Sequence, residues 1–341
     1  MDRVSQSVAD LVRAEFEKVF SAHEEPMDKG LYRDLIINVA IPGGFVNKTH
    51  NPHLPLTTAE VTRQVTGAYH AGATMWHVDP RDPEVPVGRV PIDKRIRFHK
   101  EWCDSVFEKA PDMITNVGGI SFGPPALVGN VIEERSILAE IRMAPFVDQF
   151  IKLGPRNRYI EVASLSSRTN TVAGTNLLLI NNKPSFVSDV NLLQSRGIRL
   201  ELFAYEYSDI QDMKEWVLDS GIAKQPIILD TVLGIHNTPM PTSLPQGLEL
   251  LFTLFRVLPK GVLWHMVAGG RYWLPLTAAA IMMGADMVRV GFEDAVHMYP
   301  HREDYIKEGS QVVEAVAGIA RCLGREIATA KKAREMLRLP D

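Results

Sequence analysis

The sequence of 341 residues predicts an α/β protein, a (βα)8 TIM barrel with an N-terminal helical extension. Short and mostly apolar runs recur along the chain, as expected for strands that are buried on both faces of a parallel sheet. Amphipathic helical patterns separate these runs. The composition does not change along this alternation, which favours one closed barrel. An open, doubly wound sheet is the alternative interpretation.

The strands are expected where the apolar runs are bounded by polar or turn-forming residues. They cover residues 33–41, 74–79, 112–117, 158–163, 199–205, 226–233, 262–268 and 286–291.

The helices are expected where apolar residues recur every three or four positions. Such a pattern at residues 4–22 predicts an N-terminal helix, and a polar linker follows it. Residues 1–30 would therefore form the helix and linker, and residues 31–341 the catalytic barrel domain. The first barrel helix should begin with a capping box of Thr57 and Glu60 and should end at Gly72. The other helices are expected at about 93–108, 131–153, 186–196, 208–221, 245–258, 273–284, 302–322 and 329–338.

Composition limits the partners and the location that we expect. The formal net charge is −4 and the basic clusters lie in helical patterns, so a nucleic-acid partner is disfavoured. The sequence has neither a signal-peptide core nor a run of the roughly 18 apolar residues that a membrane span needs. We therefore expect a cytoplasmic protein without a membrane partner. Cys103 and Cys322 lie in helix-like stretches away from strand ends, and both are interpreted as structural.

Catalytic groups of such barrels lie at the C-terminal ends of the strands and in the loops that follow. The second expected strand ends with His77 and Asp79, and residues two apart in a strand point to the same side. An imidazole and a carboxylate in this arrangement can share a metal such as zinc. A hydrogen-bonded His–Asp pair without a metal is the alternative.

Two other strand ends carry candidate residues. Glu293 and Asp294 follow the eighth strand, and adjacent carboxylates at a barrel mouth are costly unless they are paired or bind a metal. Arg289 can pair with one of them. The alternative interpretation is that both acids lie at the N-terminus of a helix, where negative side chains interact favourably with the helix dipole. Gly118 and Gly119 follow the third strand, where they allow either close approach of a ligand or only a tight turn.

Several short motifs stand in the order in which they occur in a known family. Single motifs are weak, but the ordered set is specific, above all the Arg-x-Gly-Phe-Glu-Asp motif of residues 289–294. From about residue 33 to residue 338 the chain resembles the beta-keto acid cleavage enzymes. The matching pieces are residues 51–57, 71–73, 117–119, 232–234, Trp264 with 267–269, 284–286, 289–294 and 324–329.

The resemblance implies a zinc-dependent enzyme that cleaves a β-keto acid with acetyl-CoA, giving acetoacetate and a new acyl-CoA. Members of the family hold zinc with a His-x-His motif on strand two and with the Glu after strand eight. The metal ligands here would be His77, Asp79 and Glu293. Asp294, in contact with Arg289, would be the base that takes the proton between the carboxylate and the ketone. No organic cofactor would be required.

The same comparison implies residues that contact the substrate. Asn116 falls where the family has a serine and Ser164 where it has a threonine, and both would orient the substrate. Gly118 and Gly119 would lie against it.

Two further positions depart from the family pattern. Asp79 replaces the second histidine, so an added negative charge should lower the Lewis acidity of the metal or favour Mn²⁺ or Mg²⁺ over Zn²⁺. Phe45 falls where the family has an active-site glutamate after strand one, which predicts a less cationic and more apolar substrate. The substrate side chain would be selected by loops such as residues 164–183 and 236–244.

These departures keep two alternatives open. One is a metal-dependent C–C lyase of retro-aldol type that does not use CoA. The other is a barrel without catalytic activity that serves as a binding or structural subunit, although the retained pair of Arg289 and Asp294 argues against it. A homo-oligomer is expected from the resemblance.

Overall fold

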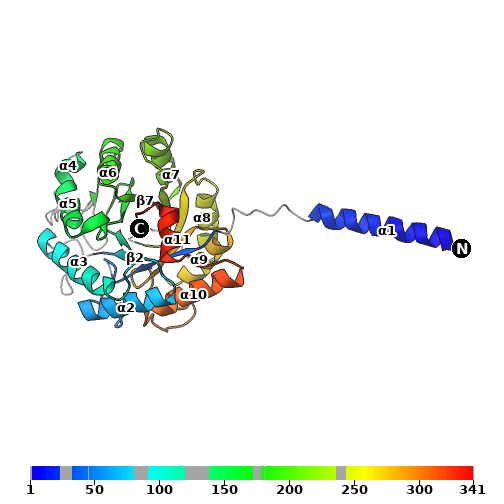
Figure 1. The fold of residues 1–341 in the computed structure, drawn as a ribbon, viewed down its shortest axis with the longest axis horizontal. Coiled ribbons are helices and arrows are strands. Elements are labelled where there is room, and N and C mark those ends of the chain that lie inside the picture. Colours follow the sequence, from blue (N-terminus) through cyan, green and yellow to red (C-terminus); the bar gives the residue numbers. More distant parts are fainter. Residues whose placement is uncertain are drawn as a thin grey trace. The chain divides into compact units, whose positions relative to one another are not determined.

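The computed structural model describes residues 2–23, 33–44, 46–79, 81, 91–119, 138–171, 178–179, 181–235 and 243–340. The chain divides into two compact units, Met1–Arg33 and Asp34–Asp341 (Figure 1). The first unit contains helix α1 (Asp2–His23), on which Val8, Leu11, Val12 and Phe16 are exposed.

The second unit is a closed barrel of parallel strands in the order β1-β10-β9-β8-β7-β4-β3-β2. The predicted (βα)8 barrel is therefore confirmed, and the open sheet is excluded. The barrel strands are β1 (Ile36–Ala40), β2 (Met75–Val78), β3 (Ile114–Val117), β4 (Val162–Ser166), β7 (Arg199–Ala204), β8 (Ile228–Leu233), β9 (Leu263–Ala268) and β10 (Met287–Gly291). Strands β5 (Asn170–Thr171) and β6 (Leu178–Leu179) form a small antiparallel sheet between β4 and the next helix.

Helices surround the barrel (Figure 1). The capping box of Thr57 and Glu60 is present, and Gly72 ends helix α2 with a φ of 119°. The described helices are α2 (Thr58–Ala71), α3 (Ile92–Phe107), α4 (Ala139–Arg142), α5 (Ala144–Lys152), α6 (Lys183–Ser195), α7 (Tyr207–Met213), α8 (Gln246–Phe255), α9 (Trp273–Met282), α10 (Gly309–Cys322) and α11 (Ala330–Leu337), with a 3-10 turn η2 (Pro155–Asn157) and a π turn η3 (Lys214–Leu218).

The fourth strand differs from the prediction. It was expected at residues 158–163 but covers Val162–Ser166. Arg156 and Asn157 have positive φ angles of 58° and 57°, and the Ile160 N–H donates to the Asn157 carbonyl at 2.6 Å, so the chain is still turning where extended structure was expected. Ser164 consequently lies within the strand and not after it.

Two predicted helices also have different limits. The helix expected at 302–322 begins only at Gly309, because the preceding segment forms a loop closed by bonds such as Ile306 N–H to the Val296 carbonyl at 2.9 Å. In the helix expected at 131–153, the described part begins at Ala139 and is divided into α4 and α5 at Met143, next to Pro145, which has no N–H to donate. Residues 131–137 lie outside the described residues.

Alternate residues of each barrel strand point inward, and their side chains form layers across the barrel interior. The lower layer, near the N-terminal ends of the strands, is an apolar cluster, and Ala333 and Leu337 of α11 also belong to it. The next inward position on these strands, two residues further on, is polar and buried, and this layer lies nearer the C-terminal ends of the strands. The lower layer contains Ile36, Met75, Ile114, Val162, Ile228, Leu263 and Met287, and the polar layer contains Asn38, His77, Asn116, Ser164, Glu201, Asp230, His265 and Arg289.

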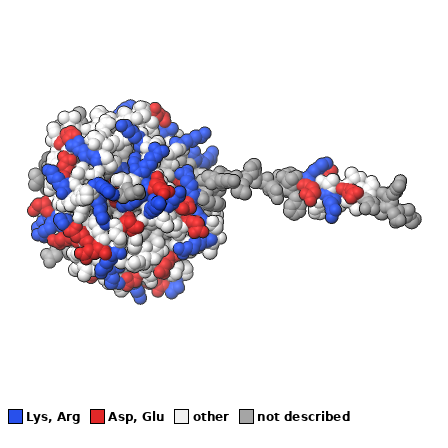
Figure 2. Space-filling view, in the orientation of Figure 1, with Lys and Arg blue, Asp and Glu red and all other residues white. Residues whose placement is uncertain are grey.

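Charged side chains of both signs cover the visible face of the second unit. Lys and Arg lie interspersed with Asp and Glu there (Figure 2). Among the described residues, no helix is long and apolar enough to cross a membrane.

Candidate active site

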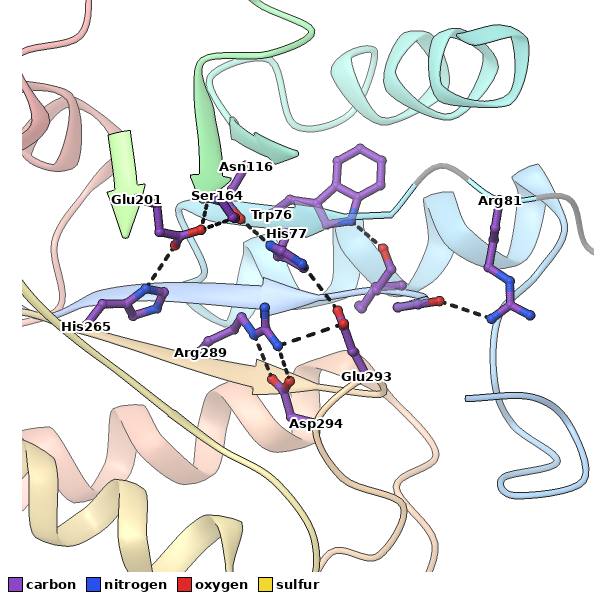
Figure 3. A network of polar contacts seen from close by, with 12 residues as sticks. Trp76, His77, Arg81, Asn116, Ser164, Glu201, His265, Arg289, Glu293 and Asp294 are labelled. Carbon is purple, nitrogen blue, oxygen red and sulfur yellow. Dashed lines mark hydrogen bonds and ion pairs between the residues drawn. The ribbon is translucent and has the colours of Figure 1, made fainter. Parts of the chain in front are cut away.

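Three predicted metal ligands converge at the C-terminal end of the barrel. His77, Asp79 and Glu293 each offer one ligand atom, and these atoms lie within 4.8 Å of one another. Their side chains are buried, and His77 Nε2 lies 3.4 Å from Glu293 Oε2 (Figure 3). The topology explains this meeting, because β1 pairs with β2 on one side and with β10 on the other.

Two glycines lie so close to these ligands that a side chain at either position would occupy the same space. A Cβ atom at Gly118 would be 2.2 Å from Asp79 Oδ1 and 2.9 Å from His77 Nε2. A Cβ atom at Gly43 would be 2.3 Å from the Cβ atom of Glu293. Any larger residue at either position would displace the ligands, so Gly118, expected to lie against the substrate, is here a close neighbour of the ligand atoms.

The predicted pair of Arg289 and Asp294 is formed. The guanidinium donates to both carboxylate oxygens, from Nη2 to Oδ1 at 2.6 Å and from Nε to Oδ2 at 3.3 Å. Arg289 Nη2 also lies 3.9 Å from Glu293 Oε1, so one buried cation faces both neighbouring acids. Such a two-point contact fixes the orientation of the Asp294 carboxylate.

Burial and charge make this centre suitable for a cation. Burial and the nearby Arg289 charge lower the pKa of His77, which keeps its imidazole neutral and able to bind a metal. Burial raises the pKa of Glu293 well above its usual range; Arg289 opposes this, and the charges of Asp79 and Asp294 add to it. A divalent cation among these acids would relieve their mutual repulsion.

Two buried arginines, which the sequence analysis did not select, support the loops around the centre. Arg81 donates to the carbonyl oxygens of Gly43 at 3.0 Å and Val46 at 2.6 Å, and so ties the loop after β1 to the end of β2. Arg95 donates to the carbonyl of Gly119 at 3.3 Å, where the backbone turns with a φ of 63°.

Asn116 and Ser164, the residues predicted to orient the substrate, lie in the same polar layer of the barrel as the ligand His77. Asn116 Oδ1 is hydrogen-bonded to His77 Nδ1, and Asn116 Nδ2 donates to Glu201 Oε2 at 2.9 Å. The Ser164 hydroxyl donates to the same Glu201 oxygen. Both side chains thus meet at Glu201, and their role toward the substrate stays a prediction.

Glu201 belongs to a second cluster that sequence reasoning missed. His265 Nδ1 lies 3.1 Å from Glu201 Oε1 and 2.8 Å from Asp230 Oδ1, and all three side chains are fully buried. Burial alone would lower the pKa of His265, but the charge of Asp230 and the bonds to both acids raise it to about 9. His265 is therefore a cation between two acids, and burial of Glu201 is offset by its bonds to His265, so that the pKa of Glu201 falls to about 2.

A signal for this cluster exists in the sequence. Glu201, Asp230 and His265 each stand at an inward position of an otherwise apolar strand. These positions lie within the strands, whereas catalytic groups of barrels are expected at the strand ends.

Comparison with known proteins decides the family. A family model described as beta-keto acid cleavage enzyme matches residues 34–339. The chain belongs to this family. The predicted relationship and enzyme class are therefore confirmed.

Relatives with curated functions agree with this family. The chain is 31% identical to 3-keto-5-aminohexanoate cleavage enzyme of Fusobacterium nucleatum over 89% of this chain and 98% of the relative. It is 23% identical to 3-dehydrocarnitine:acetyl-CoA trimethylamine transferase of Rhizobium meliloti over 92% of this chain and 99% of the relative.

A solved structure, the ternary complex of ObcA with C4-CoA adduct and oxalate, matches with a TM-score of 0.60 and 17% identity over 84% of this chain and 68% of that one. At this identity it shows a common fold.

Two predicted features of substrate selection lie outside the described residues. They are Phe45, which replaces the family glutamate, and residues 236–242 of the second predicted specificity loop.

Proposed function

We propose that the chain cleaves a β-keto acid with acetyl-CoA, with a divalent metal held by His77, Asp79 and Glu293. The observation that carries this proposal is the convergence of these three side chains beside the Arg289–Asp294 pair, in a chain of this family. Three relatives have names that include acetyl-CoA as a reactant, with 3-dehydrocarnitine, 3,5-dioxohexanoate or 3-oxoadipate as the other.

The donor set fits a divalent metal. It combines one neutral imidazole with two carboxylates, and Gly118 leaves room beside the ligand atoms. Zn²⁺ accepts these ligands, and the second carboxylate, Asp79, also suits Mn²⁺ or Mg²⁺. When bound, the metal would stabilise the negative charge that develops on the ketone oxygen of the substrate.

Asp294 is the base in this proposal. Its carboxylate is held at both oxygens by Arg289, so that it can receive the C2 proton, which is acidic because it lies between the carboxylate and the ketone. The C2 carbanion then attacks the acetyl carbonyl carbon, and the CoA thiolate leaves. The thiolate attacks the former ketone carbon, the C2–C3 bond breaks, and Asp294 returns the proton to C2. The products are acetoacetate and the new acyl-CoA.

The substrate is proposed to carry a less cationic and more apolar side chain than an amino-keto acid does. This proposal depends on Phe45 in the place of the family glutamate, which removes one carboxylate that could bind a cationic tail. Assembly as a homo-oligomer and a cytoplasmic location stay predictions from the sequence.

The decisive experiment is a panel of β-keto acids assayed with the metal-loaded protein. We expect acetoacetate and a matching acyl-CoA, detected by mass spectrometry, only when acetyl-CoA is present. Cleavage of the keto acid without acetyl-CoA would instead support the retro-aldol lyase. Treatment with a chelator should abolish the reaction, and addition of Zn²⁺, Mn²⁺ or Mg²⁺ identifies the metal that restores it.

A further inference from the structure

The two nitrogens of the His77 ring face different partners. Nε2 faces Glu293, whereas Nδ1 is hydrogen-bonded to Asn116 Oδ1. A histidine binds a metal through a nitrogen that carries no proton, and the hydrogen bond at the other nitrogen decides which one that is. The orientation of the Asn116 amide therefore determines whether His77 Nε2 can be a ligand.

Glu201 determines that orientation. An ionised carboxylate can only accept hydrogen bonds, so the Asn116 group that lies 2.9 Å from Glu201 Oε2 is the donating NH2 group. The amide oxygen must then face His77, and an oxygen can only accept. His77 Nδ1 consequently carries the proton, and Nε2 presents its lone pair toward Glu293.

Glu201 is itself held at both oxygens. Ser164 donates to Oε2, and the His265 ring donates from Nδ1 toward Oε1 at 3.1 Å, while Asp230 Oδ1 lies 2.8 Å from the same Nδ1. The cationic His265 keeps Glu201 ionised in a fully buried position, where an isolated carboxylate would favour its neutral form.

These contacts follow the register of the barrel. His77 pairs with Asn116, Ser164 with Glu201, and Asp230 with His265, each on neighbouring strands. The bonded side chains therefore run through adjacent strands from β9 and β8 through β7, β4 and β3 to β2. Figure 3 shows the part of this series from His265 through Glu201 and Asn116 to His77.

We infer that Glu201, held by His265 and Asp230, is a positioning residue that sets the tautomer of His77 through Asn116 and thereby its affinity for the metal. This inference rests on the proposed metal site. It assigns a role to a buried cluster whose Glu201 contacts Asn116, the hydrogen-bond partner of the proposed ligand His77.

Glu201→Gln tests the inference with little change of shape. A glutamine can donate to Asn116, so the Asn116 amide can turn its NH2 group toward His77 Nδ1 and move the ring proton to Nε2. We expect Zn²⁺ affinity, measured by competition with a chromophoric chelator, to fall by about 10- to 100-fold. In the metal-free protein with ¹⁵N-labelled histidines, NMR should show the His77 proton on Nδ1 in the wild type and on Nε2 in the variant, with His77→Gln used to assign the signal.

A matched control separates positioning from general destabilisation. Thr231→Val removes an equally buried polar group, which accepts a hydrogen bond from Trp264 Nε1 at 2.9 Å and lies outside the series. It should change neither the His77 tautomer nor the Zn²⁺ affinity. If Glu201→Gln does not fold, Asp230→Asn weakens the support of Glu201 and should lower the affinity in the same direction by a smaller factor.

Two results would overturn the inference. One is a Glu201→Gln variant with wild-type Zn²⁺ affinity and the proton still on Nδ1. The other is a wild type with two Zn²⁺ ions per chain, of which Glu201→Gln loses one without a change of tautomer, since Glu201, Asp230 and His265 would then be a second metal site. The NMR measurement needs no metal, so it still decides the role of Glu201 if the wild type binds no metal and the proposed function fails.

Discussion

Replacing Gly118 by alanine places a methyl group against the proposed metal ligands. Its Cβ atom would lie 2.2 Å from Asp79 Oδ1, whereas ordinary contact begins at 3.4 Å, so the carboxylate or the strand end must move by about 1.2 Å. His77 Nε2, at 2.9 Å from the same position, is also too close. The ring of His77 cannot easily turn away, because Asn116 holds its other nitrogen.

We expect Gly118→Ala to reduce metal binding and activity strongly and to reduce the stability of the fold only modestly. Overpacking of this kind costs about 1–3 kcal/mol of stability, and displacement of catalytic groups by about 1 Å can reduce activity by about 100-fold. The variant should lose most of its bound metal, measured by inductively coupled plasma mass spectrometry. Its activity should fall by about 100-fold or more.

The control for Gly118→Ala is Gly318→Ala in α10, where an added Cβ atom meets no other atom within 4 Å. This variant should keep its metal and activity, and alanine should stabilise the helix by about 0.5–1 kcal/mol. A Gly118→Ala protein with full metal content and wild-type activity would refute the placement of the metal beside Gly118.

The remaining predictions concern single groups. Glu293→Ala should abolish both metal binding and activity, whereas Glu335→Ala on the exposed face of α11 should change neither; metal at full occupancy in Glu293→Ala would remove this residue from the ligand set. Asp294→Asn should keep its metal but lose about 10²- to 10⁴-fold in kcat, and unchanged kcat would exclude Asp294 as the base. Burial alone would raise the pKa of Glu60, but bonds from backbone N–H groups and a lysine lower it from 4.5 to about 2. The ionised Glu60 carboxylate therefore stabilises the folded protein fully above pH 4.5, and this stabilisation is lost as the pH falls toward 2. The difference in unfolding free energy between wild type and Glu60→Gln, measured by urea titration, should shrink over this interval. A difference that stays constant would contradict this prediction.

The fold could be predicted from the sequence because its signals are local. The capping box at Thr57 and the stop at Gly72 depend on residues within a few positions of one another, and both are present. The fourth strand was misplaced because the turn at Arg156 depends on positive φ angles that its residue types do not require. Ser164 was therefore expected after the strand, although it faces the barrel interior.

The candidate site was predictable at its rim and not in its interior. The two-residue spacing of His77 and Asp79 and the motif around Glu293 mark strand ends, and the closed barrel brings them together. The partners of Asn116 could not be predicted, because its contact with Glu201 joins residues 85 positions apart and depends on the register of several strands.

Isotope transfer tests the central claim most directly. The metal-loaded enzyme is incubated with a β-keto acid and acetyl-CoA that carries ¹³C in both acetyl carbons, and the products are analysed by mass spectrometry and NMR. Acyl transfer predicts ¹³C at C3 and C4 of acetoacetate and an unlabelled new acyl-CoA. Cleavage of the keto acid with all of the label remaining in acetyl-CoA would contradict it.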